Sequence, residues 1–329
     1  MLGGSGFVGG GVVAEALRRG WSVTVLNRGV SGSVPDGVEQ LRGDRLEPDG
    51  LSALAGREWD FVVDTWDGRP RAALDSARAL VDSVGHYVYV SSRSVYQDPV
   101  VLGVDETGPT YDAEPDALEG HYGELKAGAE RAVRETFGDR ALIGRAGLIL
   151  GPGEDVGRLP WWLRRIERGG RVLAPGPAEL PLQYIDVRDL ANWLLDNGSA
   201  GTSGAFNVVS RTGHTTMGEF LSACMAATGS DAELVWTAPE TILAAGVVPW
   251  NDLPVWIPLG YEYRWLHEGD VSRAYATGLS PRPIAETVND TWQWLRSIEG
   301  MPARVGHATR PPIGLDPAVE AKILAPQPV

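Results

Sequence analysis

Cysteine, histidine and basic residues are scarce in this chain. Cys224 is the only cysteine, so no disulfide can form within the chain, and its helical apolar surroundings, EFLSACMAA, predict a buried thiol. Lys and Arg number 29 against 43 Asp and Glu, so the net charge of −14 repels a polyanion and no nucleic acid partner is expected. The histidines lack metal-ligand spacing, and no metal site is expected: they are His86, His121, His214, His267 and His307.

Long apolar runs are also missing. No apolar run reaches the roughly 18 residues of a membrane span, and no charged leader precedes an apolar core at the start. We therefore expect no membrane association and a cytoplasmic location, which the single cysteine also fits. With 329 residues and 43% hydrophobic content, the chain can bury the core of one large or two moderate globular domains.

Strand-like and helix-like segments alternate over the first half of the chain. The strand candidates are WSVTVLN, VEQLRGD, WDFVVDT, HYVYVSS and RALIGRAG. Between them we expect a brief helix near Leu51 to Leu54, a helix from Pro70 with Leu74, Ala77, Leu80 and Val84 on one face, and a helix around Tyr122. This alternation predicts an α/β fold with a doubly wound parallel sheet covered by helices on both faces.

A glycine-rich loop opens the chain. It fits both G-x-x-G-x-x-G and G-x-G-x-x-G, and it is formed by Gly3, Gly4, Ser5, Gly6, Phe7, Val8 and Gly9. An apolar helical stripe and the strand WSVTVLN follow, which is the context of a Rossmann-type dinucleotide site, where backbone N–H groups approach a pyrophosphate. A plain glycine-rich turn between strand and helix is the alternative.

Only two residues, Met1 and Leu2, precede this loop, although such a loop normally follows a buried strand of roughly five residues. Two explanations remain open: a first strand reduced to a stub, or a strand that continues upstream of Met1. We favour the second as an expectation.

Three further side chains suggest acid–base chemistry. Tyr122 and Lys126, in HYGELK, are four residues apart and share one helix face, so a phenol and an ammonium can act on one small ligand. The strand HYVYVSS ends in Ser91 and Ser92, which places hydroxyl groups at the carboxyl edge of the sheet, where ligands of parallel sheets bind. The alternative for all of them is a surface Tyr and Lys with a capping serine.

Together, the Gly loop, SSRSVY and YGELK resemble the short-chain dehydrogenase/reductase superfamily, specifically its extended branch of NAD(P)-dependent epimerase/dehydratase-like proteins. RAGLILGPGED, LQYIDVRDLANWL, FNVVS and GLSPRPIAETVNDTWQWL also look like parts of that branch. The resemblance implies that Tyr122 is the acid/base, that Lys126 lowers its pKa and holds the nicotinamide ribose, and that Ser92 donates a hydrogen bond to the substrate oxygen. Ser91 is expected beside the cofactor.

Cofactor preference is expected to depend on residues after the second strand, where an acidic residue binds the ribose of NAD. Asn27 and Arg28 stand there instead, and an arginine can pair with a 2′-phosphate, so NADP(H) is favoured over NAD(H). Arg28 stacked on adenine or facing solvent is the alternative. By the resemblance, Asp44 and Arg45 flank the adenine, while Thr65 and Trp66 lie beside the phosphates.

The substrate is less well indicated. Sugar-nucleotide enzymes of the branch carry a pattern resembling R-x-x-N-x-Y-G-P, whereas this chain has RAGLILGPG. We therefore expect an NADP(H)-dependent carbonyl reductase or alcohol dehydrogenase acting on a small, fairly apolar molecule. A nucleotide-sugar epimerase or dehydratase with tightly bound NAD(P) is the alternative, and a non-catalytic cofactor-sensing protein is a third reading. Expected substrate-lining residues are Arg93, Trp161, Trp162, Gln183 and Asn207.

The domain prediction follows from these motifs. Residues 1–150 form a dinucleotide-binding Rossmann domain, with return segments at about 182–210, and residues 151–181 and 211–301 form a smaller substrate-binding region. Residues 302–329 are expected to be a loosely packed tail. A homodimer through the helices near Leu74 to Val84 and Tyr122 to Phe137 is a further expectation from the resemblance.

Overall fold

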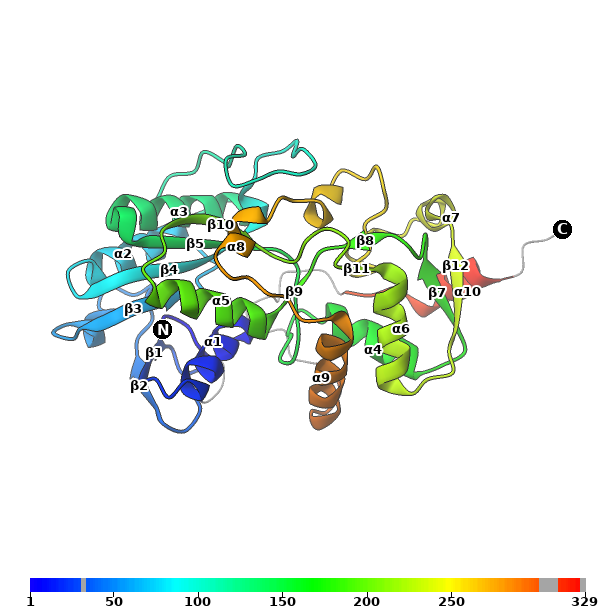
Figure 1. Cartoon of the computed structure of the whole chain (residues 1–329), viewed down its shortest axis with the longest axis horizontal. Coiled ribbons are helices and arrows are strands. Elements are labelled where there is room, and N and C mark those ends of the chain that lie inside the picture. The colour runs from blue at the N-terminus through cyan, green and yellow to red at the C-terminus, as the bar shows by residue number, and fades with distance from the viewer. Residues whose placement is uncertain (31–33, 302–312, 326–329) are drawn as a thin grey trace. The chain divides into compact units, whose positions relative to one another are not determined.

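The computed structural model describes residues 1–30, 34–301 and 313–325 (Figure 1). The chain divides into two compact units. Unit 1 comprises residues 1–147, 187–209 and 270–280, and unit 2 comprises residues 148–186, 210–269 and 281–329. The return to the first unit therefore begins at Val187 rather than near 182, and a second return, 270–280, was not anticipated.

Unit 1 contains the parallel sheet that the alternating pattern predicts. Its strands are β1 (Val23–Asn27), β2 (Val38–Arg42), β3 (Trp59–Asp64), β4 (Val84–Ser92), β5 (Ala141–Ala146) and β10 (Gly204–Val208). Four strands pair in the order β10-β5-β4-β3, and β1 pairs with β2, always in parallel. Leu2 forms a single parallel bridge to Leu26 and another to Asp64. The predicted α/β fold is confirmed.

Helices cover both faces of this sheet. Helix α1 (Phe7–Arg18) lies beside α5 (Val187–Ser199), and α2 (Pro70–Leu80) lies beside α3 (Tyr122–Phe137), as Figure 1 shows. Short helical segments, η1 (Ser52–Leu54), η2 (Arg93–Val95), η3 (Gly138–Arg140) and α8 (Ser272–Ala276), complete the unit. The predicted helix from Pro70 ends at Leu80 and not at Val84, because Val84 already belongs to β4.

Unit 2 is built from short strand pairs and helices around its own apolar core. The pairs are β6 (Ile149–Leu150) with β9 (Ile185–Asp186), β7 (Arg171–Pro175) with β12 (Glu233–Thr237), and β8 (Pro181–Leu182) with β11 (Thr215–Thr216). The helical segments are α4 (Arg158–Glu167), α6 (Met217–Thr228), α7 (Pro239–Ala244), η4 (Arg264–His267), α9 (Ile284–Ser297) and α10 (Pro317–Leu324). Cys224 is buried in this core, as predicted.

The end of the chain is more ordered than expected. Within the predicted tail, residues 302–312 and 326–329 lie outside the described residues, but α10 packs against unit 2. Glu320 of this helix is buried, forms an ion pair of 2.7 Å with Arg165, and accepts the backbone N–H of Leu173 at 3.1 Å. A carboxylate that satisfies two buried donors fixes the helix in place.

A buried carboxyl group, that of Glu154, caps the start of helix α4. Glu154 accepts the backbone N–H groups of Arg158 at 2.6 Å and Leu159 at 3.2 Å, which would otherwise lack partners in the first turn. Burial raises the pKa of Glu154 to about 7, although the positive charge of Arg158 acts in the opposite direction. The neutral form is therefore favoured in the folded protein over a pH range where an unfolded chain would ionise it.

The variant Glu154→Gln tests this. Because the folded pKa is the higher one, wild-type stability should fall as pH rises from about 4.5 to about 7 and then level off. The glutamine of the variant does not ionise, so its free energy of unfolding should fall by about 3 kcal/mol less over this pH range. The measurement is the free energy of unfolding at a series of pH values. Glu179→Gln removes the same charge at an exposed position and should keep the wild-type slope.

Candidate active site

The glycines of the first loop have three different environments. Gly3 adopts a positive φ of 99°, and a Cβ there would lie 2.5 Å from Thr65 Oγ1. A Cβ at Gly9 would lie 2.6 Å from the backbone nitrogen of Gly4, so Gly9 allows α1 to pack closely. At Gly6, by contrast, no atom of the described residues lies within 4 Å of a Cβ position. The three glycines of G-x-x-G-x-x-G thus have separate roles: Gly3 forms the turn, Gly6 leaves room for a ligand, and Gly9 allows close packing.

The start of α1 can receive an anion. Its N-cap is Gly6, which has no side chain to cap the helix, so the first N–H groups are available to a ligand. Ser5, Phe7 and Val8 are half-buried on either side of the exposed Gly6. The described residues of this loop therefore fit the pyrophosphate of a dinucleotide, with backbone N–H groups and the positive end of the helix dipole as the binding groups.

Asn27 ends β1 with an unsatisfied donor. Its Oδ1 accepts the backbone N–H of Gly29 at 3.0 Å and the Nε2 group of Gln40 at 2.8 Å. The backbone donor fixes the orientation of the amide, because only the oxygen can face it. Asn27 Nδ2 is consequently buried without a hydrogen-bond partner among the described residues. Such a group is costly unless a ligand accepts from it.

Two arginines lie near this amide. Arg28 is half-exposed, and its Nη1 is 4.0 Å from Asp44 Oδ2. The guanidinium of Arg42 lies close to Gly29, since a Cβ on that glycine would be 3.2 Å from Arg42 Cζ. The carboxyl ends of β1 and β2 therefore present a donor amide and two cations, with Asp44 as the adjoining acid.

Asp64, at the end of β3, organises the neighbouring residues. Its carboxylate binds Arg45 Nη1 at 3.0 Å, accepts the Tyr87 hydroxyl at 2.7 Å, and accepts the backbone N–H of Trp66 at 3.0 Å. The Arg45 guanidinium also lies 4.9 Å above the Trp66 ring. Thr65 follows directly after the strand. Arg45 is thus held by a buried carboxylate, and its place beside an adenine stays a prediction.

Ser91 and Ser92 have different environments at the end of β4, because successive side chains of a strand point to opposite faces. Ser91 is buried and donates to Glu130 at 2.6 Å, and Glu130 is paired with Arg145 at 2.8 Å. Ser92 is partly exposed, accepts the backbone N–H of Ser94 at 3.1 Å, and donates to the Ser94 hydroxyl at 3.2 Å. Only Ser92 is placed where a ligand can reach it.

Lys126 is buried at the base of the site. Its Nζ donates to the carbonyl oxygens of Trp66 at 2.6 Å and Val90 at 2.8 Å, and it lies 4.8 Å from the centre of the Tyr89 ring. Burial lowers the pKa of Lys126 to about 8, with nearby acids acting against the shift. One turn earlier, Tyr122 is the first residue of α3 and is 39% exposed, so its phenol is accessible.

Gly123 lets α3 begin beside the turn that follows β4. A Cβ at this position would overlap the carbonyl oxygen of Ser94 and would lie 2.9 Å from the Tyr111 ring. The missing side chain therefore brings Tyr122 and the Ser92–Ser94 turn together. Gly123 is not among the residues expected from the sequence, although a glycine inside the helical pattern HYGELK is an available signal.

The expected substrate-lining residues are divided between the two units. In unit 1, Arg93 is fully buried, and Asn207 is buried with its Oδ1 accepting the Tyr96 hydroxyl at 2.7 Å. The other three lie in unit 2. Trp161 is half-buried, Trp162 donates to the Pro254 carbonyl at 2.7 Å, and Gln183 is bonded to backbone groups of Ser210 and Gly269. Gln183, Trp162 and Asn207 already have partners within their own units.

The described ranges contain neither a metal-binding cluster nor a membrane-spanning helix. No group of three or more His, Cys, Asp or Glu side chains is placed to hold a metal ion. No helix in the same ranges has the length and apolar character needed to cross a membrane.

Comparison with known proteins identifies the family. The model of the NAD dependent epimerase/dehydratase family matches residues 1–209, and the chain belongs to this family. No curated protein sequence matches the chain.

Solved structures share the fold at low sequence identity. UDP-glucose 4-epimerase of Thermotoga maritima, solved with UDP-glucose, has a TM-score of 0.65 at 19% identity, covering 90% of this chain and 97% of that one. The Thermus thermophilus enzyme, solved with NAD, has a TM-score of 0.63 at 21% identity with the same coverages. UDP-N-acetylglucosamine 4-epimerase of Bacillus cereus has a TM-score of 0.65 at 18% identity, covering 90% and 98%.

The variant Gly123→Ala tests the close approach of α3. Helix propensity alone favours alanine by about 1 kcal/mol, but the overlap with a backbone carbonyl should outweigh this and destabilise the protein by about 1–3 kcal/mol. Chemical denaturation measures the difference. Gly10→Ala, in α1, is the matched control, because a Cβ there would approach the Gly4 carbonyl oxygen no closer than 4.0 Å. A stabilised Gly123→Ala protein would contradict the proposed contact.

Proposed function

We propose that this protein transfers hydride between a nicotinamide cofactor and a hydroxyl-bearing carbon, with Tyr122 as the acid/base. The observation that carries the proposal is the position of Tyr122, Lys126 and Ser92 at the same edge of the sheet as an open glycine-rich loop. Membership of the epimerase/dehydratase family supports it. Cys224, the only cysteine and a buried one, agrees with a cytoplasmic setting.

The described residues fit a dinucleotide. The loop around Gly6 and the start of α1 would hold the pyrophosphate, and the orphan amide of Asn27 would face the adenosine ribose. Lys126, which reaches the carboxyl edge of the sheet, would bind the nicotinamide ribose. The cofactor supplies the hydride acceptor or donor.

The chain's own groups supply the proton. A phenol has an ordinary pKa of about 10, so Tyr122 needs a stabilised phenolate to act as a base near neutral pH. The Lys126 ammonium, four residues along the same helix, provides positive charge below its pKa of about 8. Ser92, on the neighbouring strand end, would orient the substrate oxygen toward Tyr122. The proton then moves between that oxygen and the phenol.

A preference for NADP(H) is part of the proposal. Asn27 Nδ2 is a donor without a partner in the described residues, where an NAD enzyme of this fold would use an acidic acceptor. Arg28 and Arg42 add positive charge beside it. Donors and cations suit a 2′-phosphate, while the charge of Asp44 is paired with Arg28.

The hydride transfer can serve either an epimerase or dehydratase, or a carbonyl reductase. The comparisons favour the epimerase or dehydratase. Its hydride is returned to the same substrate, so the cofactor stays bound and shows no net conversion. The family match and the likeness to UDP-sugar epimerases support this reading. A nucleotide sugar is then the substrate class.

A carbonyl reductase is the second candidate, favoured by one local observation. Leu148 and Leu150 occupy the Asn and Tyr positions of the sugar-nucleotide pattern and are buried in the apolar core of unit 2. Neither can donate a hydrogen bond to a sugar or phosphate. Net oxidation of NADPH with a carbonyl compound would establish the reductase, whereas isomerisation without net oxidation would establish the epimerase. The homodimer through α2 and α3 stays a prediction.

The variant Tyr122→Phe removes the phenolic proton while keeping the ring. NADPH binding should be nearly unchanged, because the cofactor contacts lie elsewhere, but turnover should fall by about 10²–10⁴-fold. Fluorescence titration measures the binding and steady-state kinetics the turnover. An undiminished rate would reject Tyr122 as the acid/base.

The variant Arg28→Glu reverses the charge at the end of β1. NADPH affinity should fall by at least about tenfold more than NADH affinity, because only the former carries the 2′-phosphate. Arg57→Glu, an exposed arginine paired with Glu39, is a control that changes net charge equally. Equal losses of the two cofactors in Arg28→Glu would reject the phosphate contact.

A further inference from the structure

Two donors from different elements hold the side-chain amide of Asn27. The backbone N–H of Gly29 reaches its Oδ1 from the loop after β1, at 3.0 Å, and the Gln40 side chain reaches the same oxygen from β2, with its Nε2 at 2.8 Å. Because both groups donate, both select the oxygen end of the amide. The nitrogen end, Nδ2, is left without a partner among the described residues.

The register of the sheet explains why Gln40 reaches this amide. Gln40 lies opposite Val25 in the parallel pair of β1 with β2, and Val25 is two positions before Asn27. Alternate residues of a strand share one face, so the side chains of Gln40 and Asn27 lie on the same face of the pair. A diagonal neighbour on one face is within reach of a long side chain. The bond between the two side chains therefore follows from the strand register.

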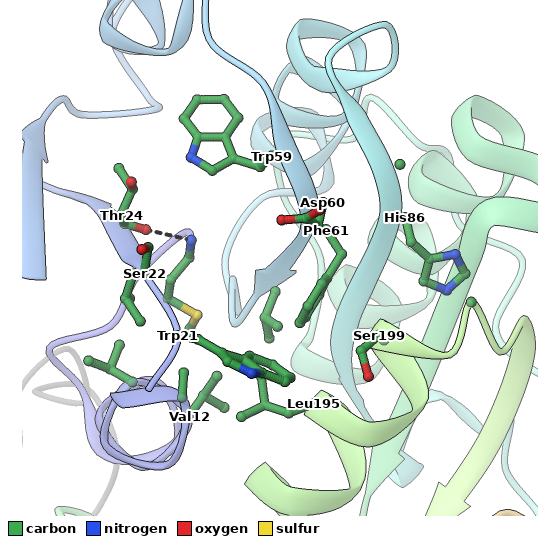
Figure 2. Close-up of a pocket in the computed structure, with 18 of the residues that line it drawn as sticks. Val12, Trp21, Ser22, Thr24, Trp59, Asp60, Phe61, His86, Leu195 and Ser199 are labelled. Atoms are coloured by element: carbon green, nitrogen blue, oxygen red, sulfur yellow. Dashed lines mark hydrogen bonds between the residues drawn. The ribbon is translucent and has the colours of Figure 1, made fainter. Parts of the chain in front are cut away.

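Asn27 lies at the ligand-binding end of β1. The other end of the strand lines a cavity of about 790 Å³, in which Ser22 and Thr24 lie opposite Asp60 and Phe61 (Figure 2). That cavity is at the amino ends of the strands, whereas Asn27 is the last residue of β1, at the carboxyl end. Ligands of parallel sheets bind at the carboxyl edge. The amide of Asn27 therefore belongs with the candidate active site.

The groups around the amide indicate what it would bind. Gly29 has a positive φ of 70° and no side chain, and a Cβ there would lie 3.2 Å from Arg42 Cζ, so the guanidinium lies against this loop. Arg28, between Asn27 and Gly29, is half-exposed. An amide donor beside two cations suits an anionic oxygen of a ligand.

We propose that Gln40 is a positioning residue that sets the cofactor preference of this site. Together with the Gly29 N–H, it holds the Asn27 amide in the orientation that presents Nδ2, a donor, to the adenosine end of the cofactor. Gln40 acts through Asn27 and does not itself contact the cofactor. This role rests on the proposed function, because it requires a dinucleotide at the carboxyl end of β1.

Replacing the Gln40 amide by a carboxylate should turn the Asn27 amide around. Gln and Glu side chains have nearly the same shape, but an ionised carboxylate accepts hydrogen bonds and donates none. In Gln40→Glu it would accept from Asn27 Nδ2, in a charge-assisted bond that is stronger than the neutral bond to Gly29. Asn27 Oδ1 would then face the cofactor, where it suits the 2′-hydroxyl of NADH and repels the 2′-phosphate of NADPH.

The test is a double-mutant cycle on the full chain, made of the wild type, Gln40→Glu, Asn27→Leu and the double variant. Fluorescence titration gives the dissociation constants of NADPH and NADH for each protein. Asn27→Leu removes the amide at similar size, so in that background Gln40→Glu changes only the charge at position 40. The difference between the two backgrounds isolates the effect that passes through Asn27.

Gln40→Glu should lower the affinity for NADPH relative to NADH, and the loss should be at least about tenfold larger with Asn27 present than with Asn27→Leu. Equal losses in the two backgrounds would show that the charge acts directly, and no loss in either would show that Gln40 has no part. Each of these results overturns the proposal. A wild type that binds neither dinucleotide would instead reject the proposed function.

Gln40→Met is the second variant, for use if Gln40→Glu does not fold. It removes the donor without adding a charge, so one of the two bonds that orient Asn27 is lost. The preference for NADPH over NADH should fall in the same direction but by less, and only with Asn27 present. An unchanged ratio of the two dissociation constants, or an equal change with Asn27→Leu, would overturn the proposal.

Discussion

The buried ammonium group of Lys126 is the constraint on which the candidate site depends. It joins α3 to the end of β4 through Val90 and to the loop after β3 through Trp66. Both partners are backbone carbonyls, so the contact fixes main-chain positions and not only side chains. The Tyr89 ring, whose centre lies 4.8 Å from the Lys126 Nζ, adds a cation–π contact to these two bonds.

Glycines at three positions allow the helices of unit 1 to pack closely. Gly9 brings α1 against the first loop, Gly123 brings α3 against the turn after β4, and a Cβ at Gly128 would lie 2.7 Å from both the Glu114 carbonyl and Pro70. At each of these positions the absence of a side chain allows the backbone to pack closely against its neighbours. As a result, α1 and α3, the two helices of the candidate site, both make close contacts at glycines.

Much of unit 1 could be predicted from sequence because its signals are local. The strand and helix order, the glycine loop and the Tyr122–Lys126 spacing each lie within a few residues of one another. The rest depends on contacts between distant residues. The pairing of Asp64 with Arg45, the burial of Ser91 on Glu130, and the backbone bonds of Gln183 have no signature in any single segment. For the same reason Val84, which fits the helical stripe of α2, belongs to the next strand, where β3 pairs with it.

The buried carboxylate of α10 has a consequence for the whole of unit 2. Glu320 is the counter-ion of Arg165, a side chain of α4 that also donates to the carbonyls of Gly169 and Arg171. Proteolytic loss of the final helix would remove this counter-ion, and breaking a buried ion pair costs up to about 3–5 kcal/mol when the remaining charge stays buried. A cut near one terminus would therefore weaken a helix some 150 positions earlier in the chain, and a fusion partner attached beyond α10 should be joined through a linker that leaves this helix seated.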